Sequence, residues 1–347
     1  MKTYKFLLVA LIATGFFAAC TNEPVIDPVK MNEPSEIAFR LQGGTPDIVT
    51  RALATTIANL DAFVVFGTDD VLDASSDLIL DGVTVARQLG GAFTYSPRAY
   101  YSAGVTSAGF FAFSPVSANV TFSSPAGLLS SVVSFDYEVL RPDNTGNISQ
   151  EDFLVADTTV TGSTALAATV DLAFRHALSR IFVTATNDAA DPVIITGLKL
   201  MNLITKGSLD VDLSTGWAWT PSALPTDTAN YEYQLAPSGG VVVQGGTIAR
   251  TLVTSMEQGM MILPQVTQIT GTGDVTAGDF ALEVTYEFAN FGTQTRYVYI
   301  PEVSPGVGYE FEAGNQYNIY ISFDGLLPIE FDVIQVDSFG APINVNP

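Results

Sequence analysis

The chain of 347 residues contains a single cysteine and a single histidine. One cysteine permits no internal disulfide, so stability must come from core burial or from assembly. A zinc site needs more such side chains, and the one cysteine is assigned below to lipid attachment, so zinc and thiol chemistry are both excluded. We expect no cofactor and no metal. Calcium stays open only at the acidic stretch from Asp69 to Asp81, which lacks the spacing of an EF-hand loop.

Basic residues are also scarce in this chain. Lys and Arg number 14 against 36 Asp and Glu, which gives a formal net charge of -22. Such a surface repels nucleic acid and anionic lipid, so we exclude both as partners of the folded part. Hydrophobic residues make up 47% and charged residues only 14%, a composition unlike that of disordered acidic chains. The length and the apolar content suffice for two domains.

Only one apolar run is long, and it lies at the N-terminus. Two lysines precede residues 6–19, the arrangement of a secretory signal peptide. The run is shorter than the about 20 apolar residues of a membrane helix. Its end, Phe-Ala-Ala-Cys at 17–20, resembles a bacterial lipoprotein processing site. We therefore predict a lipoprotein signal peptide at 1–19 and lipid on Cys20; the alternative is an ordinary signal peptide with Cys20 as a bystander.

Beyond a polar, proline-containing tether at 21–35, the hydrophobic residues alternate with period 2. In a short strand at 36–41, Ile37, Phe39 and Leu41 share one face. The same alternation recurs at 131–139 and 280–288, and turn signals separate the runs. Helical periodicity is limited to short stretches near 52–60 and 255–260.

One buried and one wetted face, with short strands and frequent turns, is typical of antiparallel β-sandwiches. We predict an all-β chain with two domains, an N-terminal sandwich at 52–162 and a C-terminal sandwich at 163–347. The boundary is placed at the small polar residues 161–164.

Candidate catalytic groups are few. His176 has Asp171 and Ser179 near it in the sequence, but no Gly-x-Ser-x-Gly elbow is present, so we interpret it as a structural histidine. No phosphate loop and no dinucleotide fingerprint occurs. The many carboxylates leave a glycosidase pair open, yet nothing singles out two of them. We predict no enzyme and no catalytic residues.

Several segments resemble one known family. They are DFLVADTTV at 152–160, VDLAFRHALSRIFVTAT at 170–186, GLKLMNLITKGSLDVD at 197–212 and AGNQYNIYISF at 313–323. With the lipoprotein signal and a Thr-Arg pair at 50–51, they are similar to the fimbrillin family of Bacteroidota, the Mfa-like shaft and tip subunits of type V pili. The most specific part is the run 172–181, where Leu172, Phe174 and His176 alternate as in a strand.

The resemblance implies two tandem transthyretin-like sandwich domains and export as an outer-membrane lipoprotein. It also implies polymerisation at the cell surface by strand exchange, after proteolysis removes the subunit's first strand. Here residues 20–51 would be the removable segment, with cleavage after Arg51 leaving Ala52 as the new N-terminus. Arg40 is a rival cleavage site inside the strand itself.

A strand donated to a neighbour would come from the tail 328–347, where Ile329, Phe331 and Val333 alternate. The alternative for this tail is an ordinary last strand of its own domain. Partners would be other copies of the chain or related pilus subunits, and the outer membrane through Cys20 before processing.

The predicted function is a structural subunit of a cell-surface fimbrium that supports adhesion. The alternative is a tip adhesin or a monomeric surface lipoprotein that binds glycan or protein, with Tyr100, Tyr101, Trp217 and Trp219 as candidate contacts. Thr158 and Thr228 follow aspartates in a pattern that resembles O-glycosylation sites of Bacteroidota.

Overall fold

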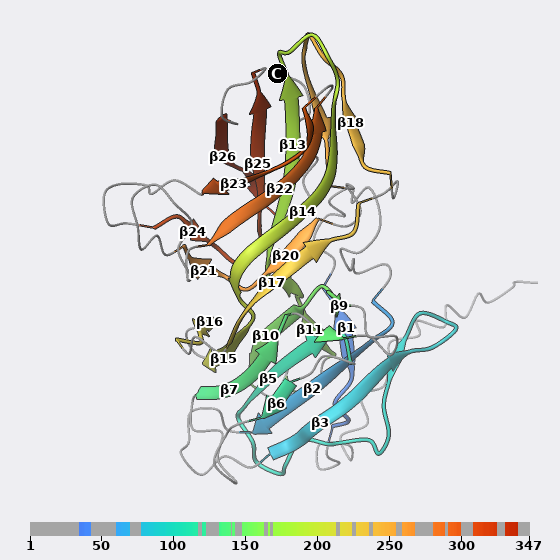
Figure 1. Ribbon diagram of the computed structural model, residues 1–347. Coiled ribbons are helices and arrows are strands. Elements are labelled where there is room, and N and C mark those ends of the chain that lie inside the picture. Colours follow the sequence, from blue (N-terminus) through green and yellow to red (C-terminus); the bar gives the residue numbers. More distant parts are fainter. Residues whose placement is uncertain are drawn as a thin grey trace, which may run out of the picture. The chain divides into compact units, whose positions relative to one another are not determined.

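The secondary-structure elements that the computed structural model describes are all β-strands, β1 to β26, and they belong to one compact unit, Pro34–Pro347 (Figure 1). The prediction of an all-β chain is confirmed. The described residues are 35–42, 60–69, 78–116, 120–122, 132–139, 141–142, 148–162, 166, 169–212, 216–223, 227–235, 239–254, 259–267, 280–288, 291–299, 308–324 and 330–338.

A sheet of six strands carries the N-terminal part of the fold. Its central strands β2 and β5 are almost uninterrupted runs of buried residues. A strand packed on both faces has such a run, whereas a strand with one wetted face alternates. The expectation of one wetted face is therefore wrong for β2 and β5. In order across the sheet the strands are β12 (Arg175–His176), β10 (Leu154–Thr161), β5 (Ser107–Ser114), β2 (Ala62–Asp69), β3 (Leu78–Arg87) and β4 (Phe93–Thr94).

The first face of this sheet packs against a four-stranded sheet. Phe135 of that sheet lies among aromatic rings of the six-stranded sheet, with centroids 4.6 Å from Phe111 and 5.5 Å from Phe66. In order, the four strands are β16 (Gly216–Pro221), β15 (Lys206–Asp212), β7 (Val132–Glu138) and β6 (Val120–Phe122).

The second face is covered by the beginning of the described chain. Phe63 and Phe110 of the six-stranded sheet are buried there in one cluster with Ile37 and Phe39. Above them, β1 (Phe39–Leu41) and β11 (Val170–Leu172) form a two-stranded parallel sheet.

Two five-stranded sheets face each other in the C-terminal part of the fold (Figure 1). Apolar side chains of both sheets, among them Ile319 and Val284, belong to one buried cluster, as in a β-sandwich. The first sheet has the order β19 (Thr247–Leu252), β13 (Ser179–Asn187), β25 (Asn315–Phe323) and β26 (Glu330–Ser338), with β20 (Met260–Ile262) also on β13. The second has the order β17 (Thr228–Tyr233), β14 (Val193–Ile204), β22 (Ala281–Phe288) and β23 (Gly292–Tyr299), with β18 (Val241–Val243) also on β14. Two further pairs are β21 (Gln265–Val266) with β24 (Glu310–Phe311), and β8 (Arg141–Pro142) with β9 (Ile148–Ser149).

The alternation predicted for β7 and β22 is confirmed. In β7, Phe135 and Tyr137 are buried and Asp136 is exposed; in β22, Val284 is buried and Glu287 is exposed. The short helix expected near 52–60 falls mostly outside the described residues, and so does the one near 255–260, where Met260 begins β20.

The run 172–181 does not form a single strand. It touches three successive strands, β11, β12 and β13, which pair with β1, β10 and β25 respectively, and Phe174 lies between the first two. The alternation of Leu172, Phe174 and His176 therefore lies in a stretch where the chain passes from one sheet to the next, because β11, β12 and β13 belong to three different sheets.

Strands from both sides of the expected domain boundary meet in one sheet. β7 pairs antiparallel with β15 along its whole length. One apolar cluster also runs from β5 and β7 into β13, β14 and β25. The division into 52–162 and 163–347 stays a prediction, and strands β15 and β16 lie in the same sheet as β6 and β7.

Candidate functional site: the groove filled by residues 35–42

Residues 35–42, called here the N-terminal segment, occupy a groove on the six-stranded sheet. Their side chains alternate: Ile37 is 0% exposed and Phe39 is 5% exposed, whereas Glu36 and Arg40 are exposed. Leu41 is half-buried and packs against the same cluster. The shared face predicted for Ile37, Phe39 and Leu41 is confirmed.

Aromatic rings form the pocket for Phe39. Phe63 and Phe110 meet its ring nearly at right angles, with centroid distances of 6.1 and 5.6 Å, and Tyr95 lies 5.8 Å away. Edge-to-face packing of this kind stabilises beyond the burial of area alone. A smaller side chain at position 39 would leave a cavity among three rings.

The backbone of the N-terminal segment is bonded along both edges. On one edge, Val170 N donates to Ala38 O at 2.8 Å and Gln42 N donates to Leu172 O at 2.9 Å. On the other edge, Ile37 N donates to Ala99 O at 3.0 Å, and a backbone bond also joins residue 101 to residue 35. The segment thus lies between β11 and the loop that contains Ala99, and its removal would leave backbone groups of both neighbours without these partners.

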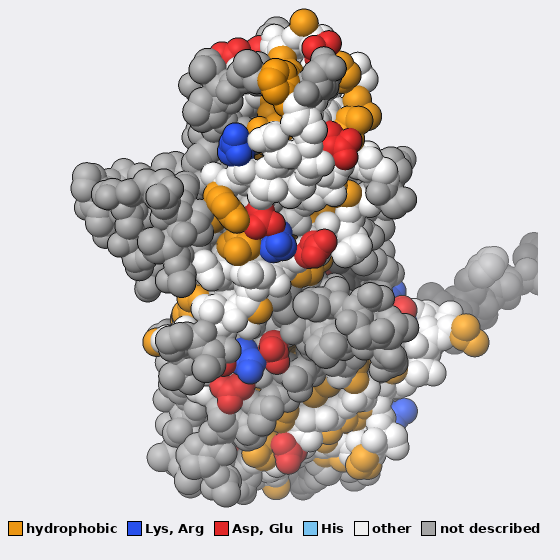
Figure 2. Space-filling view, in the orientation of Figure 1, with side chains coloured by type: hydrophobic (Ala, Val, Ile, Leu, Met, Phe, Trp, Pro, Cys, Tyr) orange, Lys and Arg blue, Asp and Glu red, His pale blue; other side chains and the backbone are white. Residues whose placement is uncertain are grey.

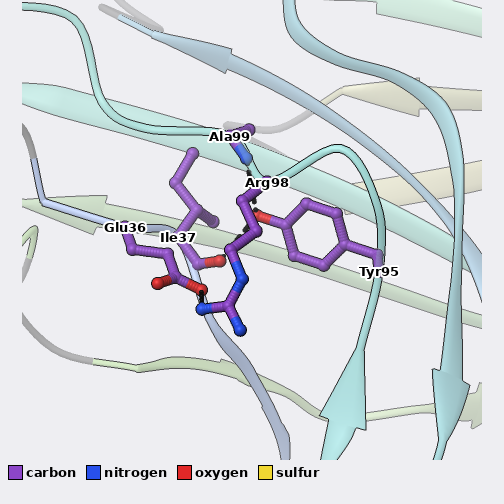
Figure 3. A network of polar contacts seen from close by, with 5 residues as sticks. All are labelled: Glu36, Ile37, Tyr95, Arg98 and Ala99. Carbon is purple, nitrogen blue, oxygen red and sulfur yellow. Dashed lines mark hydrogen bonds and ion pairs between the residues drawn. The ribbon is translucent and has the colours of Figure 1, made fainter.

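Polar side chains hold the start of the segment (Figure 3). Tyr95 donates its hydroxyl to Ile37 O at 2.6 Å and accepts from Ala99 N at 3.3 Å. Arg98 forms an ion pair with Glu36 beside it. One loop between β4 and β5 therefore binds both the backbone and a side chain of the segment.

Asp171 of β11 holds the other end. Arg40 donates from Nε and Nη2 to the two carboxylate oxygens of Asp171, at 2.7 and 2.8 Å. These two hydrogen bonds lower the pKa of Asp171 and raise the pKa of Arg40. Both side chains are partly in water, so the pair contributes more to register than to stability.

The histidine, serine and aspartate that could suggest a triad do not come together. His176 pairs with Asp152 through Nδ1, 2.9 Å from Oδ2. Ser179 donates to Glu312 O at 2.8 Å, and Asp171 binds Arg40. Among the residues that the structure describes, these three side chains serve packing and strand pairing.

The aromatic residues considered for ligand binding differ in exposure. Tyr100 is exposed, whereas Tyr101 is buried, and burial raises the pKa of its phenol to about 12. Trp217 and Trp219 are half-buried against the core, and Trp219 Nε1 donates to Ala177 O. On the face shown in Figure 2, the described charges lie in small groups of both signs rather than in one acidic patch.

The tail predicted to act as a donor pairs within its own sheet. Strand β26 lies antiparallel to β25, with Phe331 opposite Ile321 and Val333 opposite Ile319. Ile329 lies outside the described residues. The structure thus places this segment as the last strand of the C-terminal sheet, and its donor role stays a prediction.

The processing sites fall in parts of the chain that the structure leaves undescribed. These sites are Cys20, Arg51 and Ala52. Three aspartates of the acidic stretch, Asp70, Asp73 and Asp77, are also undescribed.

Over the described ranges, no group of three or more potential metal ligands occurs. No helix within those ranges is long and apolar enough to cross a membrane. Thr158 is half-buried in β10, and Thr228 is exposed in β17.

Sequence reasoning identified the N-terminal segment but missed what holds it. Tyr95, Arg98 and Asp171 lie 58, 62 and 131 residues from their partners in the chain. The Ser-Pro-Arg stretch at 96–98 signals a turn, but no local pattern links a turn to a distant strand. Only the paired topology brings these side chains to the groove.

Comparisons with known proteins agree with this fold. The fimbrillin-like family matches residues 50–336 of the chain. A fimbrial protein from Bacteroides vulgatus ATCC 8482 superimposes with a TM-score of 0.60 at 14% identity, covering 86% of this chain and 99% of that one. A candidate cell adhesion protein from Bacteroides uniformis ATCC 8492 gives 0.50 at 16% identity, covering 87% and 97%.

No curated protein matches the chain in sequence. At such low identities the two solved structures show a common fold and nothing more. The family match is the stronger finding, because it extends over most of the 347 residues and includes every strand from β2 to β25. The chain belongs to the fimbrillin-like family.

Proposed function

We propose that the chain is a structural subunit of a cell-surface fimbrium, which assembles with other pilus subunits by strand exchange at the groove. One observation carries this proposal. Residues 35–42 precede Arg51 in the chain, yet Ile37 and Phe39 complete a core that β2, β5 and β11 build. A cut after Arg51 would therefore separate a buried strand from the fold that it completes.

Cleavage would convert this strand into a removable one. Burial of two side chains such as Ile37 and Phe39 contributes about 1.5–3 kcal/mol each, so an empty groove is costly in water and favours a replacement strand. An extended strand added at such an edge gains backbone hydrogen bonds and fills side-chain pockets. Arg40 is protected in the folded chain because its backbone is paired with Asp171 in β11.

The same cut would release the membrane anchor. Export through a lipoprotein signal would place lipid on Cys20 and the subunit at the outer membrane, and cleavage after Arg51 would detach residues 20–51 with that lipid. Two tandem transthyretin-like domains, 52–162 and 163–347, remain part of the proposal. In such a division one sheet is shared by both domains, because β7 of the first pairs with β15 of the second. Family membership supports a structural rather than a catalytic role.

Arg51→Ala is expected to block assembly, because the N-terminal segment then stays covalently attached in its groove. N-terminal sequencing of surface material, gels that resolve heat-resistant ladders, and electron microscopy for filaments measure the effect. Arg296→Ala, a change at an exposed arginine of β23, is the matched control. Normal ladders from Arg51→Ala, with a mature N-terminus other than Ala52, would show the proposal to be wrong.

Cys20→Ser is expected to leave the precursor unprocessed at that site and to remove membrane anchorage of the full-length form. Fractionation and intact-mass measurement report both effects. A Cys20→Ser protein that still sediments with membranes, with unchanged mass, would contradict lipid attachment at this residue.

A ligand-binding tip subunit is the second candidate function. A hollow of about 550 Å³ beside β7 and β15 is lined by polar side chains that include Asp136, Lys206 and Asp227. A tip subunit needs an acceptor groove but need not donate a tail. Deletion of residues 328–347 that leaves assembly intact, with ligand binding retained, would favour the tip over the shaft.

A further inference from the structure

The two ends of the groove carry side chains of opposite charge. Arg98 pairs with Glu36 at the start of the N-terminal segment (Figure 3), and Asp171 binds Arg40 toward its end. The apolar pockets lie between these pairs. An occupant that satisfies the whole groove carries, in order, an acidic residue, an apolar residue, any residue, an aromatic residue and a basic residue.

The chain's own tail has the apolar spacing of this pattern. Residues 328–333, Pro-Ile-Glu-Phe-Asp-Val, repeat the Ile-x-Phe-x-aliphatic order of residues 37–41, Ile-Ala-Phe-Arg-Leu. With Phe331 in the pocket of Phe39, each apolar residue of the tail takes the place of one in the N-terminal segment. The tail could therefore fill the groove as far as shape is concerned.

The tail has the wrong charges for both ends. In this alignment Asp332 takes the place of Arg40, which puts two carboxylates side by side at Asp171. Pro328 takes the place of the acidic residue that Arg98 binds. Like charges directly opposite each other on neighbouring strands are destabilising, and an arginine without its carboxylate loses an ion pair.

Other alignments of the tail keep the charge conflict or replace it with a different cost. If the tail enters in the reverse direction with Phe331 in the aromatic pocket, Glu330 faces Asp171 instead. A shift by two residues that puts Val333 into the aromatic pocket does remove the charge conflict, because Glu330 then takes the place of Glu36 and Ile334 that of Arg40. This alignment instead leaves a cavity in a pocket built for a phenylalanine. A shift by one residue turns Glu330 and Asp332 toward the apolar floor, which is costlier still.

We propose that the groove selects a strand from a different subunit, one that carries Asp or Glu three residues before a phenylalanine and Lys or Arg directly after it, in preference to a second copy of this chain. This rests on the proposed strand exchange. The backbone hydrogen bonds and the apolar pockets bind any strand with the right apolar spacing. Asp171 and Arg98 discriminate between such strands by their charges.

The expected selectivity is modest at each position. Arg40 and Arg98 are solvent-exposed, so a single charge reversal should change binding by about three- to ten-fold at low salt. Salt screens exposed pairs, and the preference should shrink as the ionic strength rises. The apolar contribution should show no such decrease, so salt separates the two effects.

The test uses the full chain after treatment with an arginine-specific protease, with the cut after Arg51 verified by mass. Four labelled peptides compete for the groove: residues 34–43, the same peptide with Arg40→Asp, residues 327–336, and this last peptide with Asp332→Arg. Equilibrium binding is measured at low and at high salt.

The expected order at low salt is residues 34–43 ahead of the Arg40→Asp peptide, and the Asp332→Arg tail peptide ahead of the unmodified tail. Asp171→Lys in the acceptor should reverse both preferences. The comparison of the four peptides uses unmutated protein, so it stands even if Asp171→Lys fails to fold. Equal binding of all four peptides at low salt, or a preference whose size does not decrease as the salt concentration rises, would overturn the charge selection while strand exchange remains. A groove that admits none of the peptides would overturn strand exchange and the inference together.

Discussion

Phe39→Ala is expected to destabilise the uncut chain by about 3–5 kcal/mol, the range for a fully buried phenylalanine. Phe39 is 5% exposed, and its ring meets Phe63 and Phe110 edge-on. The loss comprises the apolar area removed from the core and the cavity left among the rings. Urea unfolding of the full chain, followed by fluorescence, measures the free energy of unfolding.

Gln42→Ala is the matched control for this prediction, because Gln42 lies in the same segment with an exposed side chain and bonds β11 through its backbone. It should change the free energy of unfolding by less than about 0.5 kcal/mol. Once the chain is cut after Arg51 and the segment is lost, Phe39→Ala should no longer matter. Equal stability of Phe39→Ala and wild type before cleavage would mean that the N-terminal segment contributes little to the fold.

Phe135→Ala is expected to destabilise the chain by a similar amount, about 3–5 kcal/mol, and to shift one cooperative transition. Phe135 is 1% exposed and belongs to a cluster that continues from the six-stranded sheet into the C-terminal sandwich. Removal of its ring weakens the contact with Phe111, 4.6 Å away between centroids. Calorimetry shows whether the whole heat-absorption peak moves.

Phe291→Ala is the matched control, because Phe291 is 52% exposed beside β23. This exposed substitution should cost less than about 1 kcal/mol. Two transitions, of which Phe135→Ala moves only one, would show that 52–162 and 163–347 unfold independently. A single shifted transition would mean that the shared sheet of β7 and β15 couples them.

Periodicity predicted the strands that have one wetted face. Residues 36–41, β7 and β22 alternate in the sequence and alternate in burial, because each has solvent on one side. It misjudged β2 and β5, since a strand covered on both faces has no alternation from which to infer one. It also interpreted the alternation of Leu172, Phe174 and His176 as a strand, because alternating burial continues where the chain crosses from one sheet to another.

The groove was only half predictable. The alternation of Ile37 and Phe39 in the sequence predicts that they share a buried face. No local pattern predicts which residues contact the segment. Tyr95, Arg98 and Asp171 become neighbours of the N-terminal segment through pairings that span 58 to 131 residues. The charges that we infer to select a partner belong to this second group, because their meaning depends on which strand lies opposite.

The parallel pairing of β1 with β11 also bears on the order in which the chain folds. Residues 35–42 leave the ribosome early, but Asp171 and Leu172, which complete their binding site, follow about 130 residues later. Closing so long a loop is slow compared with forming hairpins such as β2–β3. The segment that is synthesised first can therefore bind only after β2, β5 and β11 are in place. Under the proposed cleavage after Arg51, a protease that required the bound segment would cut only subunits in which these three strands have come together.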